Sequence, residues 1–243
     1  MTTTTEHNGR LGNQIIRNLS VSLIAEKNDL YVDYSSYQLI KDLGIDLFVG
    51  TNKYDETILL TDDNYISILE SLSVTSNLDP NHNYFQTKEI TNVLYNYLQG
   101  DNIKTNIINK NPFKDRYNAN NDLCIHIRLT DMAQFNPGLN YYLSAISNVH
   151  FDKLYITTDE IEHPIVRQII HLFPNNIVLV CNEIITLQFS STCKHIILSP
   201  GSFSAIIGYL SFFSNVQCMG NYPNRMQFGD MFNINGWKIL NSP

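Results

Sequence analysis

Short apolar runs alternate with longer segments of helical periodicity along the C-terminal half of the sequence. The runs predict buried strands, and the segments between them, in which apolar residues recur every three or four positions, predict helices. Strands and helices that alternate through short loops are typical of a parallel, doubly wound sheet with a ligand crevice at the carboxyl ends of its strands. The predicted strands cover residues 123–127, 153–157, 176–181, 195–198 and 216–218, and the predicted helices cover 139–146, 161–173, 184–193 and 203–213.

The N-terminal half has a less regular pattern. Residues 9–14 form a glycine-containing loop, which precedes a predicted helix to about Lys27 and a predicted strand over 30–33. A strand over 57–61 and helices over 65–72 and 88–98 follow. Residues 99–121 are rich in Asn, Lys and Asp and predict the connection between two lobes. We therefore expect an N-terminal domain over residues 1–118 and a C-terminal domain over residues 119–243.

The composition is that of an ordinary soluble globular protein, since 43% of the 243 residues are hydrophobic and 16% are charged. Lys and Arg number 16 and Asp and Glu number 23, which gives a net charge of −7. Because affinity for phosphate backbones needs clustered Lys and Arg, such a chain is a poor candidate for binding nucleic acid or anionic membranes. Any phosphate ligand must therefore be held by a local concentration of positive groups.

The sequence shows no targeting or membrane segment. It lacks a basic stretch followed by an apolar one near its start, and no apolar run approaches the roughly 20 residues of a membrane helix. We expect a cytoplasmic chain without a signal peptide or membrane span.

The first candidate ligand segment is Gly9–Gln14, directly before a predicted helix. Glycines let the backbone approach a ligand closely, and a helix N-terminus offers free N–H groups and a partial positive charge to an anion. The segment lacks the spacing of a dinucleotide-binding GxGxxG motif, and no strand clearly precedes it. A plain turn at the start of a helix is the alternative interpretation.

The second candidate is His126–Asp131, at the end of the first C-terminal strand. Side chains alternate along a strand, so His126 and Arg128 point to one face of the sheet. An arginine at the carboxyl end of a core strand is suited to holding a phosphate through short, charge-assisted bonds. Asp131 could orient that guanidinium or accept from a ligand hydroxyl. The alternative is a structural ion pair between Arg128 and Asp131.

The third candidate is Ser199–Ser204, between a strand and an amphipathic helix. Ser202 is a plausible N-cap, and the free N–H groups of its neighbours would attract an anion. Asp159 ends another strand, which should reach the same edge of the sheet, and an acid there can accept hydrogen bonds from a nucleoside. A capped loop without a ligand, and helix capping by Asp159, are the alternatives.

Taken together, these segments resemble the inverting α-1,2-fucosyltransferases and related GT-B-like fucosyltransferases. The order and approximate spacing agree from residue 9 to about residue 213, which is nearly the whole chain. In chain order, the matching segments are GRLGNQ (9–14), YVD (31–33), HIRLTD (126–131, similar to HxRRxD), TTD (157–159), CKH (193–195) and SFS (202–204, similar to S-T-F-S).

The resemblance implies an α/β, GT-B-like fold with two Rossmann-type lobes. The parallel sheet would lie in the C-terminal, nucleotide-sugar-binding lobe, and the N-terminal lobe would be a reduced, acceptor-side one. It further implies metal-independent transfer of a deoxy-sugar, usually fucose from GDP-fucose, to a glycan hydroxyl with inversion. The partners would be the nucleotide-sugar donor and the glycan acceptor, without a metal or other cofactor and without nucleic acid.

The same resemblance assigns roles to the matched residues. Arg128 would neutralise the charge that develops on the leaving diphosphate, and preorganised groups of this kind are usually the largest catalytic contribution. Asp33, Asp131 and Asn13 remain open as the general base. The catalytic set is Arg128, Asn13 and Asp131, and the donor-binding set is Gly9, Arg10, Gly12, Asn13, His126, Arg128, Asp159, Ser202, Phe203 and Ser204.

Several positions depart from the family pattern. Leu129 stands where HxRRxD has its second arginine, Thr130 replaces the usual glycine, and the tryptophans that usually follow S-T-F-S are absent. A related transferase with another nucleotide-sugar donor, or a non-catalytic module that binds nucleotide or glycan, therefore stays as an alternative. A dehydrogenase-like protein is disfavoured, because no GxGxxG follows a strand.

Overall fold

The computed structural model describes residues 2–6, 8–220 and 230–240, and the chain divides into two compact units. Unit 1 comprises Met1–Ile107 with Gly229–Met231, and unit 2 comprises Ile108–Phe228 with Phe232–Pro243. This division, after Ile107, comes earlier in the chain than the expected boundary after residue 118. The connecting segment over 99–121 contains α5 (Asp101–Lys110) and the 3-10 helix η1 (Lys114–Arg116).

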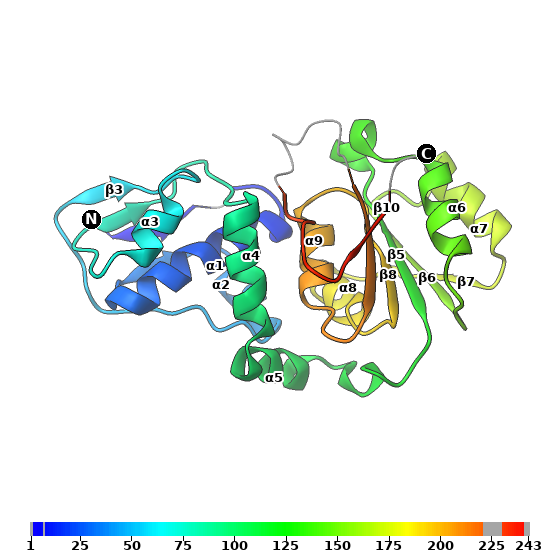
Figure 1. The fold of residues 1–243 in the computed structure, drawn as a ribbon, viewed down its shortest axis with the longest axis horizontal. Helices are drawn as coiled ribbons and strands as arrows, with labels where there is room; N and C mark the ends of the chain where they lie inside the picture. Colours follow the sequence, from blue (N-terminus) through cyan, green and yellow to red (C-terminus); the bar gives the residue numbers. More distant parts are fainter. Residues whose placement is uncertain (1, 7, 221–229, 241–243) are drawn as a thin grey trace. The chain divides into compact units, whose positions relative to one another are not determined.

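Unit 2 is built on a six-stranded parallel sheet with the order β10-β9-β8-β5-β6-β7 (Figure 1). Strands β5, β6 and β7 follow one another toward one edge, and β8, β9 and β10 follow one another toward the other. The order therefore reverses between β5 and β8, as it does in dinucleotide-binding folds. The bounds are β5 (Leu123–Ile127), β6 (Leu154–Thr158), β7 (Asn176–Val178), β8 (His195–Ile197), β9 (Asn215–Met219) and β10 (Lys238–Leu240).

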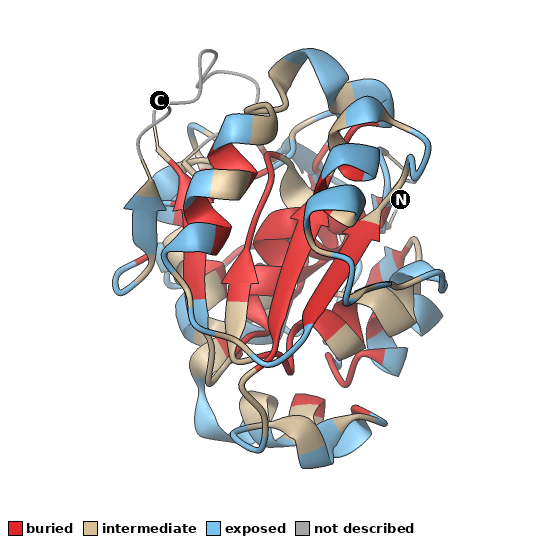
Figure 2. Cartoon of the chain, turned by 90° about the vertical axis from the view of Figure 1, so that its right-hand side faces the viewer, coloured by how far each residue is buried: buried red, intermediate tan, exposed pale blue. Residues whose placement is uncertain are grey.

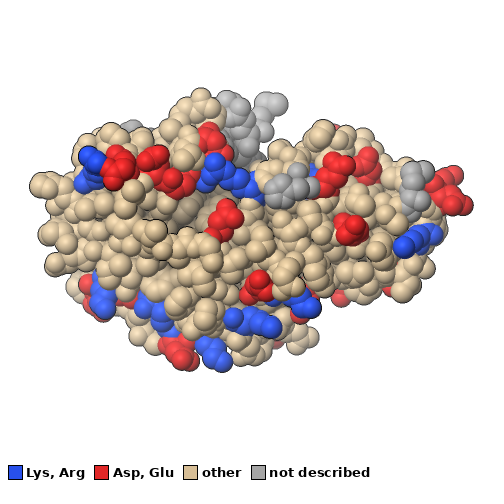
Figure 3. All heavy atoms as spheres, turned by 180° about the vertical axis from the view of Figure 1, so that it is seen from behind, with Lys and Arg blue, Asp and Glu red and all other residues tan. Residues whose placement is uncertain are grey.

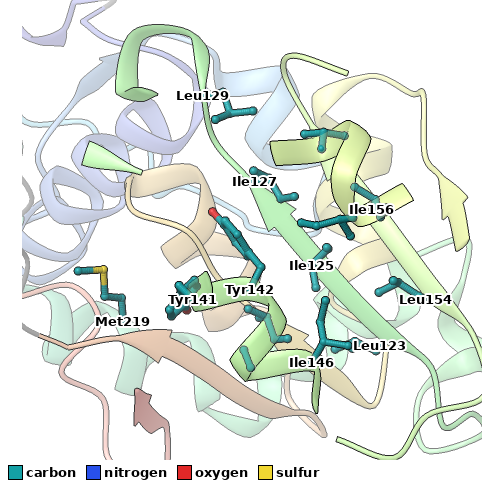
Figure 4. Packing of buried hydrophobic residues seen from close by; sticks show 14 residues of the cluster. Leu123, Ile125, Ile127, Leu129, Tyr141, Tyr142, Ile146, Leu154, Ile156 and Met219 are labelled. Atoms are coloured by element: carbon teal, nitrogen blue, oxygen red, sulfur yellow. The ribbon is translucent and has the colours of Figure 1, made fainter. Parts of the chain in front are cut away.

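Helices cover both faces of this sheet, and its central strands are buried (Figures 1 and 2). Ile125 and Ile127 pack in one cluster with Tyr142 of α6 (Figure 4), whereas Cys124 and His126 face the opposite side. The alternation expected for this strand is thus confirmed. The helices are α6 (Leu139–Ser147) and α7 (Pro164–Leu172) on the first face, and α8 (Glu183–Ser190) and α9 (Ser202–Tyr209) on the second.

Unit 1 is built from two parallel strand pairs and the helices around them. The Leu78 N–H donates to the hydroxyl of Thr3 at 2.8 Å and so joins one pair to the other. Within the described ranges, none of the helices has the length and apolar character that crossing a membrane requires. The elements are β1 (Thr3–Thr5) with β2 (Val32–Tyr34), β3 (Thr57–Leu59) with β4 (Asn77–Asp79), and α1 (Leu11–Asn28), α2 (Tyr37–Asp42), α3 (Tyr65–Glu70) and α4 (Lys88–Gln99).

Helix α1 buries an arginine in the core of unit 1. Arg17 is fully buried, and its guanidinium donates to the main-chain carbonyl groups of Asn81, at 2.9 Å, and Asn83. Burial lowers the pKa of Arg17, which the negative charges of nearby acids only partly oppose. Since a buried charge needs hydrogen-bonding partners, Arg17 fixes the loop that precedes α4.

In unit 2, a second arginine lies between two aromatic rings and a buried carboxylate. The guanidinium of Arg116 donates to Asp122 at 2.8 Å and to the hydroxyl of Thr192 at 3.1 Å. It also lies 4.4 Å from the centroid of the Phe189 ring, a distance at which cation–π attraction is effective. Because the Asp122 side chain is only 7% exposed, Arg116 supplies its main electrostatic compensation.

We expect Arg116→Met to destabilise unit 2 by about 3 kcal/mol, because the substitution leaves the Asp122 carboxylate buried without its cation. Urea unfolding can be followed through the fluorescence of Trp237, the single tryptophan of the chain. The double variant Arg116→Met with Asp122→Asn should recover part of the loss. The control is Arg167→Met, since Arg167 pairs with Glu162 at the surface and contributes about 1 kcal/mol or less. Equal effects of the two arginine substitutions would contradict the prediction.

Candidate functional site

Three strands of unit 2 end side by side at the point where the sheet order reverses. Arg128 directly follows β5, Asp159 directly follows β6, and Ser199 lies two residues beyond β8. The Arg128 N–H donates to the Ser199 hydroxyl at 3.0 Å, and the Arg128 side chain pairs with Asp159. The expectation that these segments meet at one edge of the sheet is confirmed.

The guanidinium of Arg128 is held between two carboxylates. Its Nη2 lies 2.7 Å from Oδ1 of Asp131, and its Nη1 lies 2.7 Å from Oδ2 of Asp159. The Arg128 side chain is 14% exposed, so most of it is removed from water. The structure therefore contains the Arg128–Asp131 ion pair that the sequence offered as an alternative to a ligand contact, and it adds Asp159 to that pair.

Asp159 organises the turn that follows β5. Its Oδ1 accepts from the Leu129 N–H at 2.8 Å, and its Oδ2 accepts from the Thr130 hydroxyl at 2.6 Å. Burial on its own would raise the pKa of Asp159, but the bonds from Thr130 and Leu129 and the charge of Arg128 outweigh it and lower that pKa. Asp159 is thus ionised and makes contacts within the chain, in addition to any contact with the nucleoside that the resemblance assigns to it.

His126 lies beneath Arg128 in a chain of hydroxyl groups. Its Nδ1 is 2.6 Å from Oγ of Ser204, and Oγ of Ser199 lies 3.1 Å from that hydroxyl. Donation from Ser199 to Ser204 and from Ser204 to Nδ1 uses both hydroxyl protons and leaves the ring proton on Nε2. Ser199 then remains free to accept from the Arg128 N–H. The imidazole thus helps to orient the main chain at Arg128.

The environment of His126 keeps its ring neutral. Burial, together with the positive charge of Arg128, lowers its pKa from the usual 6.5 to about 4, although the charge of Asp159 acts in the opposite direction. A neutral ring can accept at Nδ1, and a protonated ring cannot. Ser204 is fully buried in this network. A contact between Ser204 and a nucleotide-sugar donor, which the resemblance predicts, would therefore compete with the hydrogen bond between Ser204 and His126.

The start of α9 differs in one respect from the sequence prediction. Gly201, with φ of 112°, is the N-cap residue, and Ser202 is the first residue of the helix. Ser202 is therefore not the N-cap, because glycine takes the left-handed conformation that this turn requires. Phe203 follows it, and its ring centroid lies 5.4 Å from that of His126.

Two further residues of the site were not singled out by the sequence. The amide of Asn136 donates to the Arg128 carbonyl at 3.0 Å and to the Tyr142 hydroxyl at 2.9 Å. The segment from Arg128 to Asn136, which includes the 3-10 helix η2 (Thr130–Phe135), is thereby closed on itself. Asn136 precedes Pro137-Gly138, a typical turn sequence, which could have indicated that it closes this segment. The sequence pattern marks Tyr142 only as an apolar position of a helix.

Leu129 occupies the position of the second arginine in HxRRxD, the segment that residues 126–131 resemble. It is 1% exposed and belongs to the apolar cluster that contains Ile127 and Tyr142 (Figure 4). Its side chain therefore packs in the core, on the side of the sheet opposite His126.

The other predicted residues, Gly9, Arg10, Gly12 and Asn13, lie in unit 1. Strand β1 precedes Gly9 and Arg10, contrary to the sequence interpretation that found no clear strand there, and Gly12 and Asn13 lie in the first turn of helix α1 rather than in a loop. Gly9 has φ of 75°, and a Cβ at this position would collide with Asn13. The Asn13 side chain accepts from the Gln86 amide at 2.9 Å.

Gln14, which was predicted as the last residue of a loop over 9–14, lies in helix α1, because the helix already begins at Leu11; its side chain has a structural role. Its amide donates to the carbonyl groups of Asn8 at 2.6 Å and Gly9 at 3.1 Å, and its Oε1 accepts from Ser35 at 2.6 Å. Gln14 thus ties Asn8 and Gly9, which precede α1, to Ser35, which follows β2. No separate function was predicted for Gln14, and these bonds explain its place in the GRLGNQ segment.

On the face that Figure 3 shows, basic and acidic side chains are interspersed, and neither sign of charge forms a large patch. Among the residues that the structure describes, no group of three or more His, Cys, Asp or Glu side chains could hold a metal ion.

We expect the stability of unit 2 to fall by about 3 kcal/mol between pH 6.5 and pH 4 through His126 alone. Over this range the unfolded chain binds a proton at His126 and the folded chain does not, so acid favours unfolding. Above pH 6.5 the ring is neutral in both states and contributes nothing. The free energy of unfolding, measured in urea at several pH values, should depend less steeply on pH in His126→Asn than in the wild type.

The same substitution at exposed His150 controls for the loss of an imidazole elsewhere in unit 2. Parallel pH profiles of the wild type and His126→Asn would show that the buried ring does not titrate as its surroundings require.

No family model matches this sequence, and no curated protein matches it. Among solved structures, the chain is similar to the crystal structure of fucosyltransferase NodZ from Bradyrhizobium, with 12% sequence identity and a TM-score of 0.54 over 88% of this chain and 94% of that chain. A structure of NodZ alpha-1,6-fucosyltransferase soaked with GDP-fucose matches with 11% identity and a TM-score of 0.45 over 86% of this chain and 92% of that chain. The first similarity confirms the expected fold class: the chain has an α/β, GT-B-like fold of the kind found in a fucosyltransferase.

Proposed function

We propose that this chain is a glycosyltransferase that transfers a fucosyl group from GDP-fucose to a glycan hydroxyl, with inversion and without a metal ion. The observation that carries the proposal is the position of Arg128 at the carboxyl end of β5, where the strand order reverses. Ligands of doubly wound sheets bind at this place. The ordered segments shared with α-1,2-fucosyltransferases support the choice of sugar and linkage class.

Arg128 fits the chemical demand of such a transfer. When the bond from the sugar to the diphosphate breaks, negative charge develops on the β-phosphate. A guanidinium that is already oriented stabilises this charge without reorganisation at the moment of reaction. Asp159 orients one arm of the guanidinium, and Ser199 holds the main chain at Arg128, so its position is fixed before the donor arrives.

The remaining assignments belong to the same proposal. His126, Asp159, Ser202, Phe203 and Ser204 would bind the donor in unit 2, and Gly9, Arg10, Gly12 and Asn13 would contribute from unit 1. Arg128, Asn13 and Asp131 are the candidate catalytic residues of this proposal, and the general base is left open among Asn13, Asp131 and Asp33.

A second candidate function is a non-catalytic module that binds a nucleotide or a glycan. The observation in its favour is that both terminal nitrogens of Arg128 are engaged by carboxylates. A donor phosphate therefore shares this guanidinium, which has five N–H groups, with two carboxylates of the chain itself. A transferase that uses a different nucleotide-sugar is the further alternative, because Leu129 removes one of two arginines in the signature segment.

A panel of GDP-sugars and UDP-sugars separates these possibilities. We expect GDP and GDP-fucose to raise the melting temperature by about 5–10 °C at roughly 100-fold excess over Kd, and turnover of GDP-fucose to release GDP. Turnover with a different donor would identify the related transferase. Binding without release of nucleotide, in the presence of glycan acceptors, would identify the module. No stabilisation by any nucleoside diphosphate would reject the proposed function.

Arg128→Ala should lower turnover about 100- to 1,000-fold while the chain remains folded, because it removes the group that stabilises the leaving diphosphate. Arg128→Lys should recover little, since a lysine does not reproduce the planar fork of the guanidinium. Arg167→Ala is the matched control, because it removes an exposed arginine from the same unit. Circular dichroism checks the fold of each variant, and full activity of folded Arg128→Ala would reject its assigned role.

A further inference from the structure

The peptide groups on both sides of the Arg128 Cα atom are hydrogen-bonded to side chains. The Arg128 N–H donates to the Ser199 hydroxyl at 3.0 Å, and the Arg128 carbonyl accepts from the Asn136 amide at 3.0 Å. These two bonds hold the planes of the two peptide groups that flank this Cα atom. Because those planes define the main-chain dihedral angles of Arg128, they set the direction in which its side chain leaves the main chain.

The Asn136 amide has a defined orientation. Its Oδ1 accepts from the Gly138 N–H at 3.0 Å, which is the local bond of an Asx turn. A main-chain N–H can only donate and a main-chain carbonyl can only accept. The bonds to Gly138 and to Arg128 together therefore determine which end of the amide is the oxygen and which is the nitrogen.

The same amide is anchored to the core of unit 2. Its Nδ2 also donates to the Tyr142 hydroxyl at 2.9 Å, and Tyr142 is fully buried in the apolar cluster of Figure 4. The Tyr142 ring packs edge-on against that of Tyr141, with the ring centroids 5.0 Å apart. Since packed neighbours hold a polar group in one position, Asn136 connects helix α6 firmly to the Arg128 carbonyl.

Tyr142 also connects the two side chains that hold the Arg128 main chain. Its oxygen accepts from Asn136, so its own proton is available to another acceptor. Burial raises the pKa of Tyr142, and hydrogen bonds with Asn136 and Ser199 oppose this rise. Asn136, Tyr142 and Ser199 thus form one network around the main chain at Arg128.

We propose that Asn136 is a positioning residue, which directs the Arg128 guanidinium at a bound diphosphate by donating to the Arg128 carbonyl. The inference rests on the proposed function, because the diphosphate is that of the nucleotide-sugar donor. Asn136 acts through Arg128, needs no contact of its own with the donor and takes part in no covalent step. Its effect on the ligand therefore depends on the presence of the Arg128 side chain.

Asn136→Asp is the most informative substitution. It preserves the shape of the side chain and the oxygen that accepts from Gly138, but it removes the donor to Arg128 and Tyr142. We expect kcat for release of GDP from GDP-fucose, with water or a glycan as acceptor, to fall about 10- to 100-fold, while KM changes by less than about threefold. Gln134→Glu is the matched control, because it adds an exposed negative charge to the same segment and should leave kcat unchanged.

A double-mutant cycle tests whether Asn136 acts through Arg128. Calorimetry at constant ionic strength gives the Kd of GDP, whose terminal phosphate carries the charge that transfer develops, for the wild type, Asn136→Asp, Arg128→Ala and the double variant. We expect Asn136→Asp to weaken GDP binding about tenfold when Arg128 is present and less than about twofold when it is absent. Weakening by the same factor in both backgrounds would overturn the inference, because the effect would then come from the added charge or from a general loosening of unit 2.

Should Asn136→Asp fail to fold, Asn136→Ser replaces it in the cycle. A serine hydroxyl can accept from the Gly138 N–H and adds no charge, but it is one bond shorter than the Asn136 amide and does not hold the Arg128 carbonyl. We expect this variant to weaken GDP binding about threefold or more, and only when Arg128 is present. Wild-type affinity in this variant would contradict the positioning role.

The outcomes separate the inference from the proposed function. Unchanged kcat and GDP affinity in folded Asn136→Asp would reject the positioning role and leave the transferase in place. The expected cycle for GDP, without turnover of any nucleotide-sugar, would support the positioning role and reject the transferase. Unchanged GDP affinity in Arg128→Ala would also reject the positioning role, since Asn136 would have nothing to act through. Absence of GDP binding in the wild type would reject both.

Discussion

The position of the Arg128 guanidinium is set by the point in the sheet where the strand order reverses. Parallel strands that diverge to either side of β5 leave their carboxyl ends without a covering helix, and side chains from β5, β6 and β8 can meet there. Asp159 accepts from Arg128, Leu129 and Thr130, so one carboxylate sets the direction of the whole turn. A charged group at the end of a buried strand is stable here because its partners come from the neighbouring strands.

The same arrangement explains why His126 remains neutral. A second positive charge beneath Arg128, in a buried position, would add repulsion to the cost of desolvation. The neutral ring instead takes part in the hydroxyl chain through Ser204 and Ser199, which ends at the Arg128 N–H. The positive charge of the site is thereby concentrated on a single group that reaches solvent.

Much of unit 2 could be predicted from the sequence, because its strands are continuous apolar runs and its helices have clear periodicity. The short elements were missed for a physical reason. Strand β1 consists of three threonines, and β10 begins with a lysine, so neither has the apolar signal of a buried strand. The placement of Arg128 beside Asp159 could be inferred from parallel strand ends, whereas Asn136 and Ser199 bond to the main chain, and a sequence pattern does not specify such contacts.

Helix α5 was not predicted, for a different reason. Residues 101–110 are mostly polar, and composition favoured a linker, yet Ile107 is buried and the helix begins with an aspartate and ends with a lysine. Charges of these signs stabilise the ends of a helix through its dipole. Polar composition thus did not exclude a helix that buries only a narrow stripe.

Leu129 shows how the fold limits the chemistry of this site. Its side chain lies in the apolar cluster with Ile127 and Tyr142, so an arginine there, with the main chain unchanged, would place a charge in the core. The turn after β5 therefore accommodates one guanidinium directed at the strand ends and one apolar residue directed inward.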